Sequence, residues 1–262
     1  MRPRLLDDWP AVAERVRAAR SLAIFLDFDG TLAPTVNTPG EAEIERAARS
    51  ALRALAANPK ARVCIISGRR RADVVALVGI PGVIYLGVHG AETATARVSD
   101  SVASIVRDAR DELTRRLNGT RGIAIEDKGI AFAVHYRNAG HRETSRARKL
   151  LENVATSREG ALKILHGDCV WEVLPREIGG KGEAARRLWR SRSPMSLPVY
   201  IGNDATDEGA YRTLAEGVTA KVGAAGSTHA HYLLKDTREV ARFLERLRVE
   251  MGLREEIARS VH

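Results

Sequence analysis

Two acidic residues follow an apolar stretch near the start of the chain. Asp27 and Asp29 stand two residues apart in the string FLDFDGTL. Like charges held together at the end of a hydrophobic strand repel each other unless a cation or a proton compensates them. Hard carboxylate oxygens favour Mg²⁺ among the divalent cations. The pair therefore indicates a magnesium site, although a polar strand end would explain a DxD pair that stood alone.

Two further stretches carry groups that suit a phosphate. Ser67, in the string IISGR, offers a hydroxyl, and the backbone amides beside it, including that of Gly68, can hold a phosphate oxygen. Lys181, in GGKGE, can neutralise charge on a transferring phosphoryl group. Each has a plainer interpretation, as a serine-glycine turn or as a solvated lysine at a helix start. Their order along the chain favours the phosphate interpretation.

A fourth polar stretch, IGNDATDE, follows another apolar run. Its oxygen-bearing side chains can complete a magnesium site with the first acidic pair, and Asn203 and Asp204 are the expected ligands. Asn203 offers a neutral carbonyl oxygen with less charge than a carboxylate, so the sequence leaves open which of the two binds the ion directly. Asp207 is expected to orient Lys181 or a metal-bound water rather than to bind the metal.

Strand-length apolar runs alternate with helical patterns in the first part of the chain. The expected elements are a strand at 22–28, a helix at 41–58, a strand at 62–66, a helix at 73–78 and a strand at 83–88. This alternation predicts a parallel sheet with helices on both faces, and ligands of such sheets bind beyond the carboxyl ends of the strands. The acidic pair and Ser67 fall at that edge.

From about Thr93 the pattern changes to an α+β block. Its expected elements are helices at 99–117 and 142–156 and strands at 122–127, 129–136, 162–166 and 169–173. After Pro175 the α/β pattern returns, with helices at 181–190, 208–214 and 240–249 and strands at 199–201, 218–222 and 231–234. We therefore expect a catalytic core at 1–92 and 175–262 and an inserted cap domain at 93–174.

Composition narrows the class of protein. The 262 residues carry a net charge of +9, which suits either a nucleic acid or a small anionic substrate. No nucleic-acid-binding motif is recognisable, and the arginines lie at helical spacings typical of a solvated face, so we expect no nucleic-acid partner. Cys64 and Cys169 lack metal-site or disulfide spacing. Without an apolar run typical of a signal peptide or a membrane helix, a cytoplasmic protein is expected.

The four polar stretches, in this order, resemble motifs I to IV of the haloacid dehalogenase (HAD) phosphohydrolases. The resemblance implies an α/β fold with a HAD-like Rossmannoid core, a parallel sheet and an inserted α+β cap. It also implies that Asp27 attacks phosphorus and forms an aspartyl-phosphate, while Asp29 protonates the leaving oxygen and then activates water. Ser67, Gly68 and Lys181 would bind the phosphoryl group, with Arg69 behind them.

Further strings sharpen the resemblance. DFDGTLAP, ISGR, GVHGAE, EDK with HYR, and GNDATDE together look like the trehalose-6-phosphate phosphatases, over about residues 20 to 235. In that family two cap glutamates and a lysine contact the sugar and its phosphate, which implies substrate roles for Glu126, Lys128 and Glu172. Cross-strand pairing on a hairpin would explain the first two equally well. The Gly-Asn-Asp at 202–204 departs from the family's usual Gly-Asp-Asp.

The roles of four further residues stay open, two of them at the expected junction of core and cap. His89 and Glu92 could contact substrate or only brace a hinge, and His135 and Arg137 are ambiguous in the same way. The resemblance implies Mg²⁺-dependent hydrolysis of trehalose 6-phosphate with the cap closing over the sugar, and a functional link to a trehalose-phosphate synthase. The alternatives are a HAD phosphatase for sucrose phosphate, mannosyl-phosphoglycerate or a related metabolite, and a non-catalytic sugar-phosphate-binding regulatory module.

Overall fold

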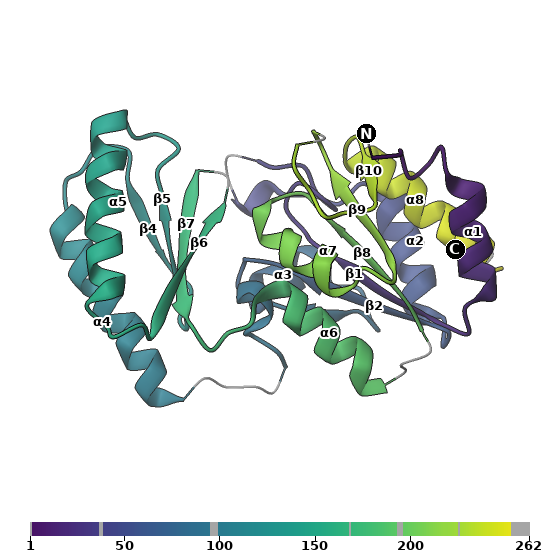
Figure 1. Ribbon diagram of the computed structural model, residues 1–262, viewed down its shortest axis with the longest axis horizontal. Helices are drawn as coiled ribbons and strands as arrows, with labels where there is room; N and C mark the ends of the chain where they lie inside the picture. The colour runs from purple at the N-terminus through teal and green to yellow at the C-terminus, as the bar shows by residue number, and fades with distance from the viewer. Residues whose placement is uncertain are drawn as a thin grey trace, which may run out of the picture.

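The computed structural model describes residues 2–36, 39–94, 99–167, 169–192, 196–224 and 226–252. These residues form two sheets, each with its own helices (Figure 1). The larger sheet has six strands in the order β10-β9-β8-β1-β2-β3, and the smaller has four in the order β4-β5-β7-β6. The predicted fold class, a parallel α/β sheet with a separate α+β unit, is confirmed.

The larger sheet is parallel at every strand pair. Its strands are β1 (Leu22–Leu26), β2 (Ala61–Ile66), β3 (Ile84–Leu86), β8 (Leu197–Gly202), β9 (Val218–Val222) and β10 (Tyr232–Leu234). All five residues of β1 are buried, because this strand lies between β2 and β8 and is covered on both faces. A continuous apolar run, without polar alternation, is what such a position requires.

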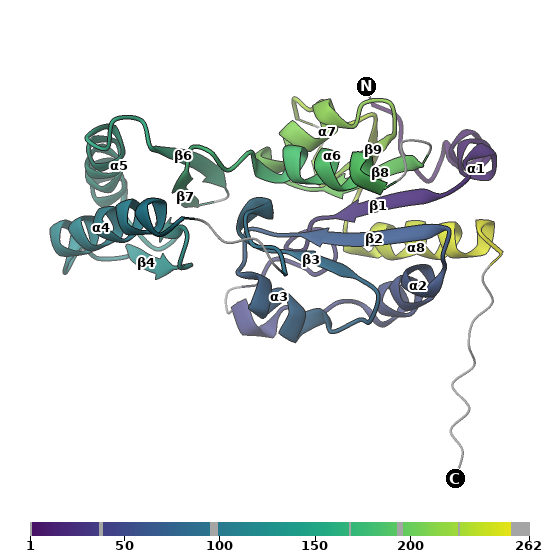
Figure 2. The same cartoon turned by 90° about the horizontal axis from the view of Figure 1, so that it is seen from below.

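Helices cover both faces of this sheet (Figure 2). On one face lie α1 (Trp9–Ala18), α2 (Arg46–Ala57), α3 (Arg71–Val78) and α8 (Thr237–Glu250). On the other lie α6 (Gly180–Arg192) and α7 (Glu208–Thr213). Three short 3-10 turns complete this part of the described chain: η1 (Pro39–Glu41), η2 (Val88–Gly90) and η3 (Ala205–Asp207).

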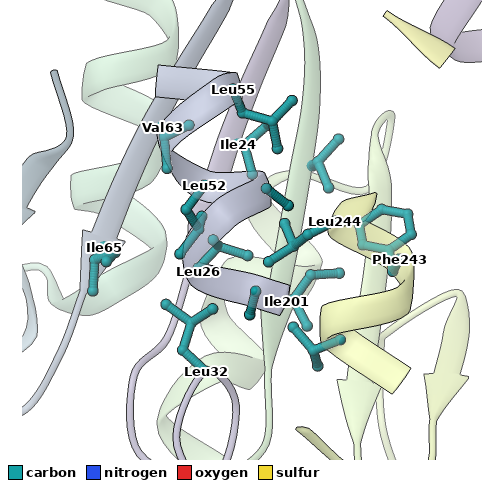
Figure 3. Packing of buried hydrophobic residues seen from close by; sticks show 14 of the residues in the cluster. Ile24, Leu26, Leu32, Leu52, Leu55, Val63, Ile65, Ile201, Phe243 and Leu244 are labelled. Atoms are coloured by element: carbon teal, nitrogen blue, oxygen red, sulfur yellow. The ribbon is translucent and has the colours of Figure 1, made fainter. Parts of the chain in front are cut away.

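The core divides along β1 according to the alternation of its side chains. Ile24 and Leu26 point to one face, where they pack with Leu52 of α2 and Phe243 of α8 (Figure 3). Phe25 points to the opposite face and packs in the cluster under α6 and α7. The strand is therefore held from both sides, which fixes the position of the residue that follows it.

The smaller sheet is antiparallel and has its own apolar cluster. Its elements are α4 (Asp100–Leu117), β4 (Ala124–Asp127), β5 (Phe132–His135), α5 (His141–Thr156), β6 (Leu162–Gly167) and β7 (Val170–Pro175). Phe132, Trp171 and Val173 pack against α4 and α5 on one face of the sheet. Residues between them in the strands, such as Ala133 and Glu172, therefore point to the other face.

Several predicted boundaries were wrong. The helix expected from 41 begins at Arg46, because residues 39–41 form a separate 3-10 turn. The strand expected at 83–88 ends at Leu86, because the chain then bends into η2 with a positive φ at His89. Helix α1 was not anticipated. Among the described residues, no helix combines the length and the apolar character needed to cross a lipid bilayer.

Candidate functional site

The predicted site residues follow three adjacent strands of the parallel sheet. Asp27 comes directly after β1, Ser67 directly after β2 and Asn203 directly after β8. Because β1 pairs with both β2 and β8, the carboxyl ends of the three strands lie side by side. The backbone N–H of Asp27 donates to the carbonyl of Ile201 at 2.9 Å, which continues the ladder to the edge of the site. This edge is where ligands of such sheets bind.

The Asp27 side chain is buried and already held from two directions. Its side chain accepts a hydrogen bond from the Lys181 ammonium, with Nζ 2.8 Å from Oδ1, and one from the Thr31 hydroxyl at 3.3 Å from Oδ2. Lys181 lies in the first turn of α6, directly after Gly180, and is buried as well. The lysine was predicted from sequence; the contact from Thr31 was missed, although the string DFDGTL contains that residue.

Asp207 organises the loop after β8. Its Oδ2 accepts the backbone N–H groups of Asn203 and Asp204 at 2.9 and 3.1 Å, and its Oδ1 accepts Lys181 at 2.9 Å and the Tyr200 hydroxyl at 2.7 Å. Burial would raise the pKa of Asp207, but the charge and hydrogen bond of Lys181 outweigh it, so the pKa is lowered. Both oxygens of Asp207 are thus occupied within the protein. Tyr200, inside an apolar strand, was missed from sequence.

The negative charge at this edge exceeds the positive charge. Burial raises the pKa of Asp27 to about 8; Lys181 opposes the rise, and Asp207 and Asp204 add to it. One buried ammonium therefore faces three carboxylates. A divalent cation would relieve this imbalance, and the donor atoms available are the hard oxygens that Mg²⁺ prefers. On charge and donor chemistry the residues fit such an ion.

The predicted set of four metal ligands is not assembled as a cluster of carboxylates. Among the described residues, no group of three or more His, Cys, Asp and Glu side chains has an arrangement that could hold a metal ion. Oδ1 of Asp204, one of the predicted ligands, accepts the backbone N–H and the hydroxyl of Thr206. The Asn203 amide lies against Gly30, where an added Cβ would come within 2.1 Å of its nitrogen.

Asp29, another of the predicted metal ligands, has its carboxylate paired with Arg69. The guanidinium donates from Nε to Oδ2 at 2.7 Å and from Nη2 to Oδ1 at 2.6 Å, a bidentate pair. Arg69 also lies over the Phe28 ring, 5.3 Å from its centroid. Both residues were predicted for the site, but their pairing was not. This ion pair requires the carboxyl ends of β1 and β2 to be neighbours.

Two of the predicted cap residues, Lys128 and Glu172, meet the core beside Gly68. Lys128 donates from Nζ to Glu172 Oε1 at 2.7 Å and to the carbonyl of Gly68 at 2.9 Å, and both side chains are buried. Glu126 is opposite Ala133 on β5, and Ala133 is opposite Glu172 on β7, so the two glutamates share one face of the smaller sheet. That face is turned toward the loop that contains Ser67.

Glu172 is ionised in this setting. Burial would raise its pKa, but the neighbouring His89 imidazole and the Lys128 ammonium lower it to about 2. Glu126 is more exposed and pairs with His135 at 2.8 Å, which places that histidine beside the cap glutamates. The His135 bond and the Lys128 charge lower the pKa of Glu126 as well.

Glu92 has a structural role. Its Oε2 accepts the backbone N–H of Arg71 at 2.6 Å, at the first residue of α3. Its backbone N–H and carbonyl both pair with Gly87. Of the two alternatives that the sequence left open, contact with substrate or bracing, these contacts correspond to bracing.

A cavity of about 270 Å³, lined by Ser21, Lys60, Arg62 and Trp189 among others, lies at the opposite edge of the sheet.

Comparison with known proteins gives one family. The family model described as Trehalose-phosphatase matches residues 25–237. The trehalose-phosphate phosphatase of Mycobacterium tuberculosis is 34% identical over 248 residues, covering 87% of this chain and 62% of that protein. That of Mycobacterium avium is also 34% identical and is covered to 63% of its length. The chain thus spans less than two thirds of these relatives.

Solved structures share the fold. The C-terminal domain of C. albicans trehalose-6-phosphate phosphatase superposes with a TM-score of 0.78 at 24% identity, covering 96% of this chain and 99% of that chain. Trehalose-6-phosphate phosphatase of Aspergillus fumigatus superposes with a TM-score of 0.66 at 27% identity, covering 94% and 98%. The predicted HAD-like architecture is confirmed by these likenesses.

Proposed function

Because this chain belongs to the trehalose-phosphatase family, we propose that it hydrolyses trehalose 6-phosphate to trehalose and phosphate. The observation that carries the proposal is Asp27, a buried carboxylate at the end of β1, held by Lys181 within a group of residues contributed by three strand ends. A carboxylate in this setting is oriented for attack on a phosphoryl group, and the ammonium beside it offsets the negative charge of that group.

The proposed reaction has two steps. In the first, a carboxylate oxygen of Asp27 forms a bond to phosphorus, the bond from phosphorus to the sugar oxygen breaks, and Asp29 gives a proton to that oxygen. In the second, Asp29 takes a proton from water, the water oxygen bonds to phosphorus, and the aspartyl-phosphate bond breaks. Asp29 must leave its pair with Arg69 to act, since Arg69 engages both of its oxygens.

The transferring phosphoryl group would lie against the loop after β2. Ser67 would donate its hydroxyl, Gly68 its backbone N–H, and Lys181 its charge. Arg69 supports this loop, because its backbone N–H donates to the Ser67 hydroxyl at 3.1 Å.

Mg²⁺ is the proposed cofactor. Asp27, Asn203 and Asp204 would hold it, and Asp29 becomes available once its pair with Arg69 opens. When bound, the ion would supply positive charge that stabilises the phosphoryl group. The excess of carboxylates over ammonium groups around Asp27 supports this assignment.

The sugar would be bound by Glu126, Lys128 and Glu172. We infer that residues 93–174 form the cap and that residues 1–92 and 175–262 form the core, with hinges near Glu92 and Pro175. Within these ranges, residues 1, 37–38, 95–98, 168, 193–195, 225 and 253–262 lie outside the described residues. Cap closure would exclude water during the reaction. We also place the enzyme in the cytoplasm, linked to a trehalose-phosphate synthase that supplies its substrate.

Substrate profiling tests this proposal. Phosphate release is measured from trehalose 6-phosphate, glucose 6-phosphate and sucrose 6-phosphate, each with Mg²⁺ and with EDTA. We expect a preference for trehalose 6-phosphate and a loss of turnover in EDTA. Turnover of another sugar phosphate alone would reject the substrate, and no turnover of any of the three would favour a regulatory sugar-phosphate-binding module.

A further inference from the structure

The turn η2 holds two successive residues in an uncommon backbone conformation. Val88 and His89 have φ of 46° and 56°, in the left-handed region that favours glycine. A β-branched residue such as Val88 is especially disfavoured there, and the surrounding structure must hold it in place. The turn is held by hydrogen bonds from the Val88 N–H to the Arg69 carbonyl at 2.8 Å and from the His89 N–H to the Ser67 carbonyl at 2.9 Å. Such strain clusters at functional sites.

The strained turn directs the His89 side chain into the junction between core and cap. The imidazole lies over Gly68, because a Cβ added to that glycine would meet His89 Cε1 at 3.0 Å and Nε2 at 3.2 Å. Oε1 of Glu172 would lie 3.4 Å from the same added Cβ and is 3.8 Å from Nε2 of His89. His89 thus meets the cap glutamate proposed to bind sugar at the loop proposed to bind phosphate.

The polar atoms at this junction are incompletely paired. Within the part of the chain that the structure describes, both ring nitrogens of His89 and Oε2 of Glu172 are buried without a hydrogen-bond partner. A buried polar atom without a partner destabilises the fold, and native proteins contain few of them. At this junction a donor, the His89 ring of the core, and an acceptor, Oε2 of Glu172 of the cap, both lack a hydrogen-bond partner. A hydroxyl group, which donates and accepts, satisfies both.

We propose that His89 determines substrate specificity by hydrogen-bonding a hydroxyl of the sugar whose phosphate lies at Ser67, opposite Glu172 of the cap. This inference rests on the proposed function and adds a core residue to the cap residues assigned above. His89 and Glu172 are both buried, and Lys128 joins Glu172 to the Gly68 carbonyl. To admit the sugar, the cap moves away from His89 and the pair of Lys128 with the Gly68 carbonyl opens.

The competing role for His89 is a brace that only holds the cap against the core. A brace affects every substrate alike, since it acts through the shape of the site. A contact with a sugar hydroxyl affects only substrates that carry one. The ratio of kcat/KM for a sugar phosphate to kcat/KM for an aryl phosphate therefore separates the two roles.

The test compares wild type with His89→Asn, on trehalose 6-phosphate and on p-nitrophenyl phosphate. Asparagine tolerates the left-handed conformation, so the substitution disturbs the backbone little. Its side chain is too short to reach the sugar. His231→Asn, a histidine at the far end of the sheet next to β10, is the control. We expect the ratio of the two kcat/KM values to fall about 10- to 100-fold in His89→Asn, mainly through KM for the sugar phosphate. An equal loss on both substrates, or no loss, would overturn the proposal.

Failure of the proposed function is a separate result. If the wild type releases no phosphate from trehalose 6-phosphate, that substrate is wrong, and the role of His89 is judged from calorimetric binding of trehalose 6-phosphate. Weaker binding by His89→Asn than by wild type would support the contact. Equal affinity, or no binding by either, would overturn it.

Discussion

The two polar clusters of this molecule differ in how complete they are. Around Asp27, Lys181 and Asp207 the side chains are joined by hydrogen bonds, and Asp207 fixes the loop after β8 through backbone N–H groups. At the junction of core and cap, Lys128 and Glu172 are paired, but Glu172 Oε2 and the His89 ring lack partners among the described residues. Asp27 and Lys181 are held in position before substrate arrives, while the recognition groups require substrate to complete them.

Removing the central ammonium should have the largest effect. Lys181→Met leaves Asp27 and Asp207 buried without their cation, so we expect the free energy of unfolding to fall by about 3–5 kcal/mol. Phosphate release should fall by about 10²- to 10³-fold, because the phosphoryl charge loses its ammonium. Urea unfolding and a phosphate assay measure the two effects. Lys235→Met, at an exposed lysine, is the control, and an equal loss of stability in the two variants would contradict the account.

Glu172→Gln tests the recognition cluster in the same way. The carboxylate has a folded pKa of about 2 against an ordinary 4.5, so its ionised form stabilises the fold by about 3 kcal/mol at neutral pH. Since the folded pKa is the lower one, this contribution is present above pH 4.5 and is lost as the pH falls toward 2.

Urea unfolding of wild type and Glu172→Gln across that range of pH gives the measurement. The difference in stability should shrink as the pH falls. Glu152→Gln, at an exposed ion pair on α5, should change stability by less than about 1 kcal/mol. A difference between wild type and Glu172→Gln that does not depend on pH would reject the assigned role of the carboxylate.

A smaller effect is expected from replacing Gly202, whose backbone lies close to the side chain of Asp207. A Cβ at Gly202 would lie 2.3 Å from Cγ of Asp207, so Gly202→Ala must displace that buried side chain. We expect a loss of about 1–3 kcal/mol in thermal or urea unfolding, with lower turnover as Lys181 shifts. Gly209→Ala is the matched control, because nothing lies within 4 Å of its Cβ position. If both variants are equally stable, the loop after β8 is less rigid than the contacts indicate.

The sequence was most informative about the core site, for physical reasons. The apolar run of β1 can only be a strand buried on both faces, and residues after such strands in an α/β pattern gather at one edge. Asp27, Ser67 and Asn203 were therefore predictable as neighbours. Helix α1 was missed, although its Trp9 packs against Phe243 of α8, because that contact joins the two ends of the chain.

Pairings that depend on register or backbone strain could not be predicted. The row from Glu126 through Ala133 to Glu172 exists only because β5 pairs with β4 and β7 in one register, and a shift of one residue would separate the two glutamates. The left-handed turn at His89 carries no sequence signal of its own, since valine and histidine stand where glycine or asparagine is typical. These features emerge only from tertiary packing.

The central claim is that Asp27 is the nucleophile. Asp27→Asn keeps the shape and most hydrogen bonds of the side chain but removes the attacking charge, and it can be compared with Asp8→Asn, a change far from the site. With trehalose 6-phosphate and Mg²⁺, the account predicts that Asp27→Asn folds, as judged by circular dichroism, and releases no phosphate above background, while Asp8→Asn retains wild-type turnover. Turnover by Asp27→Asn close to that of wild type would contradict the account.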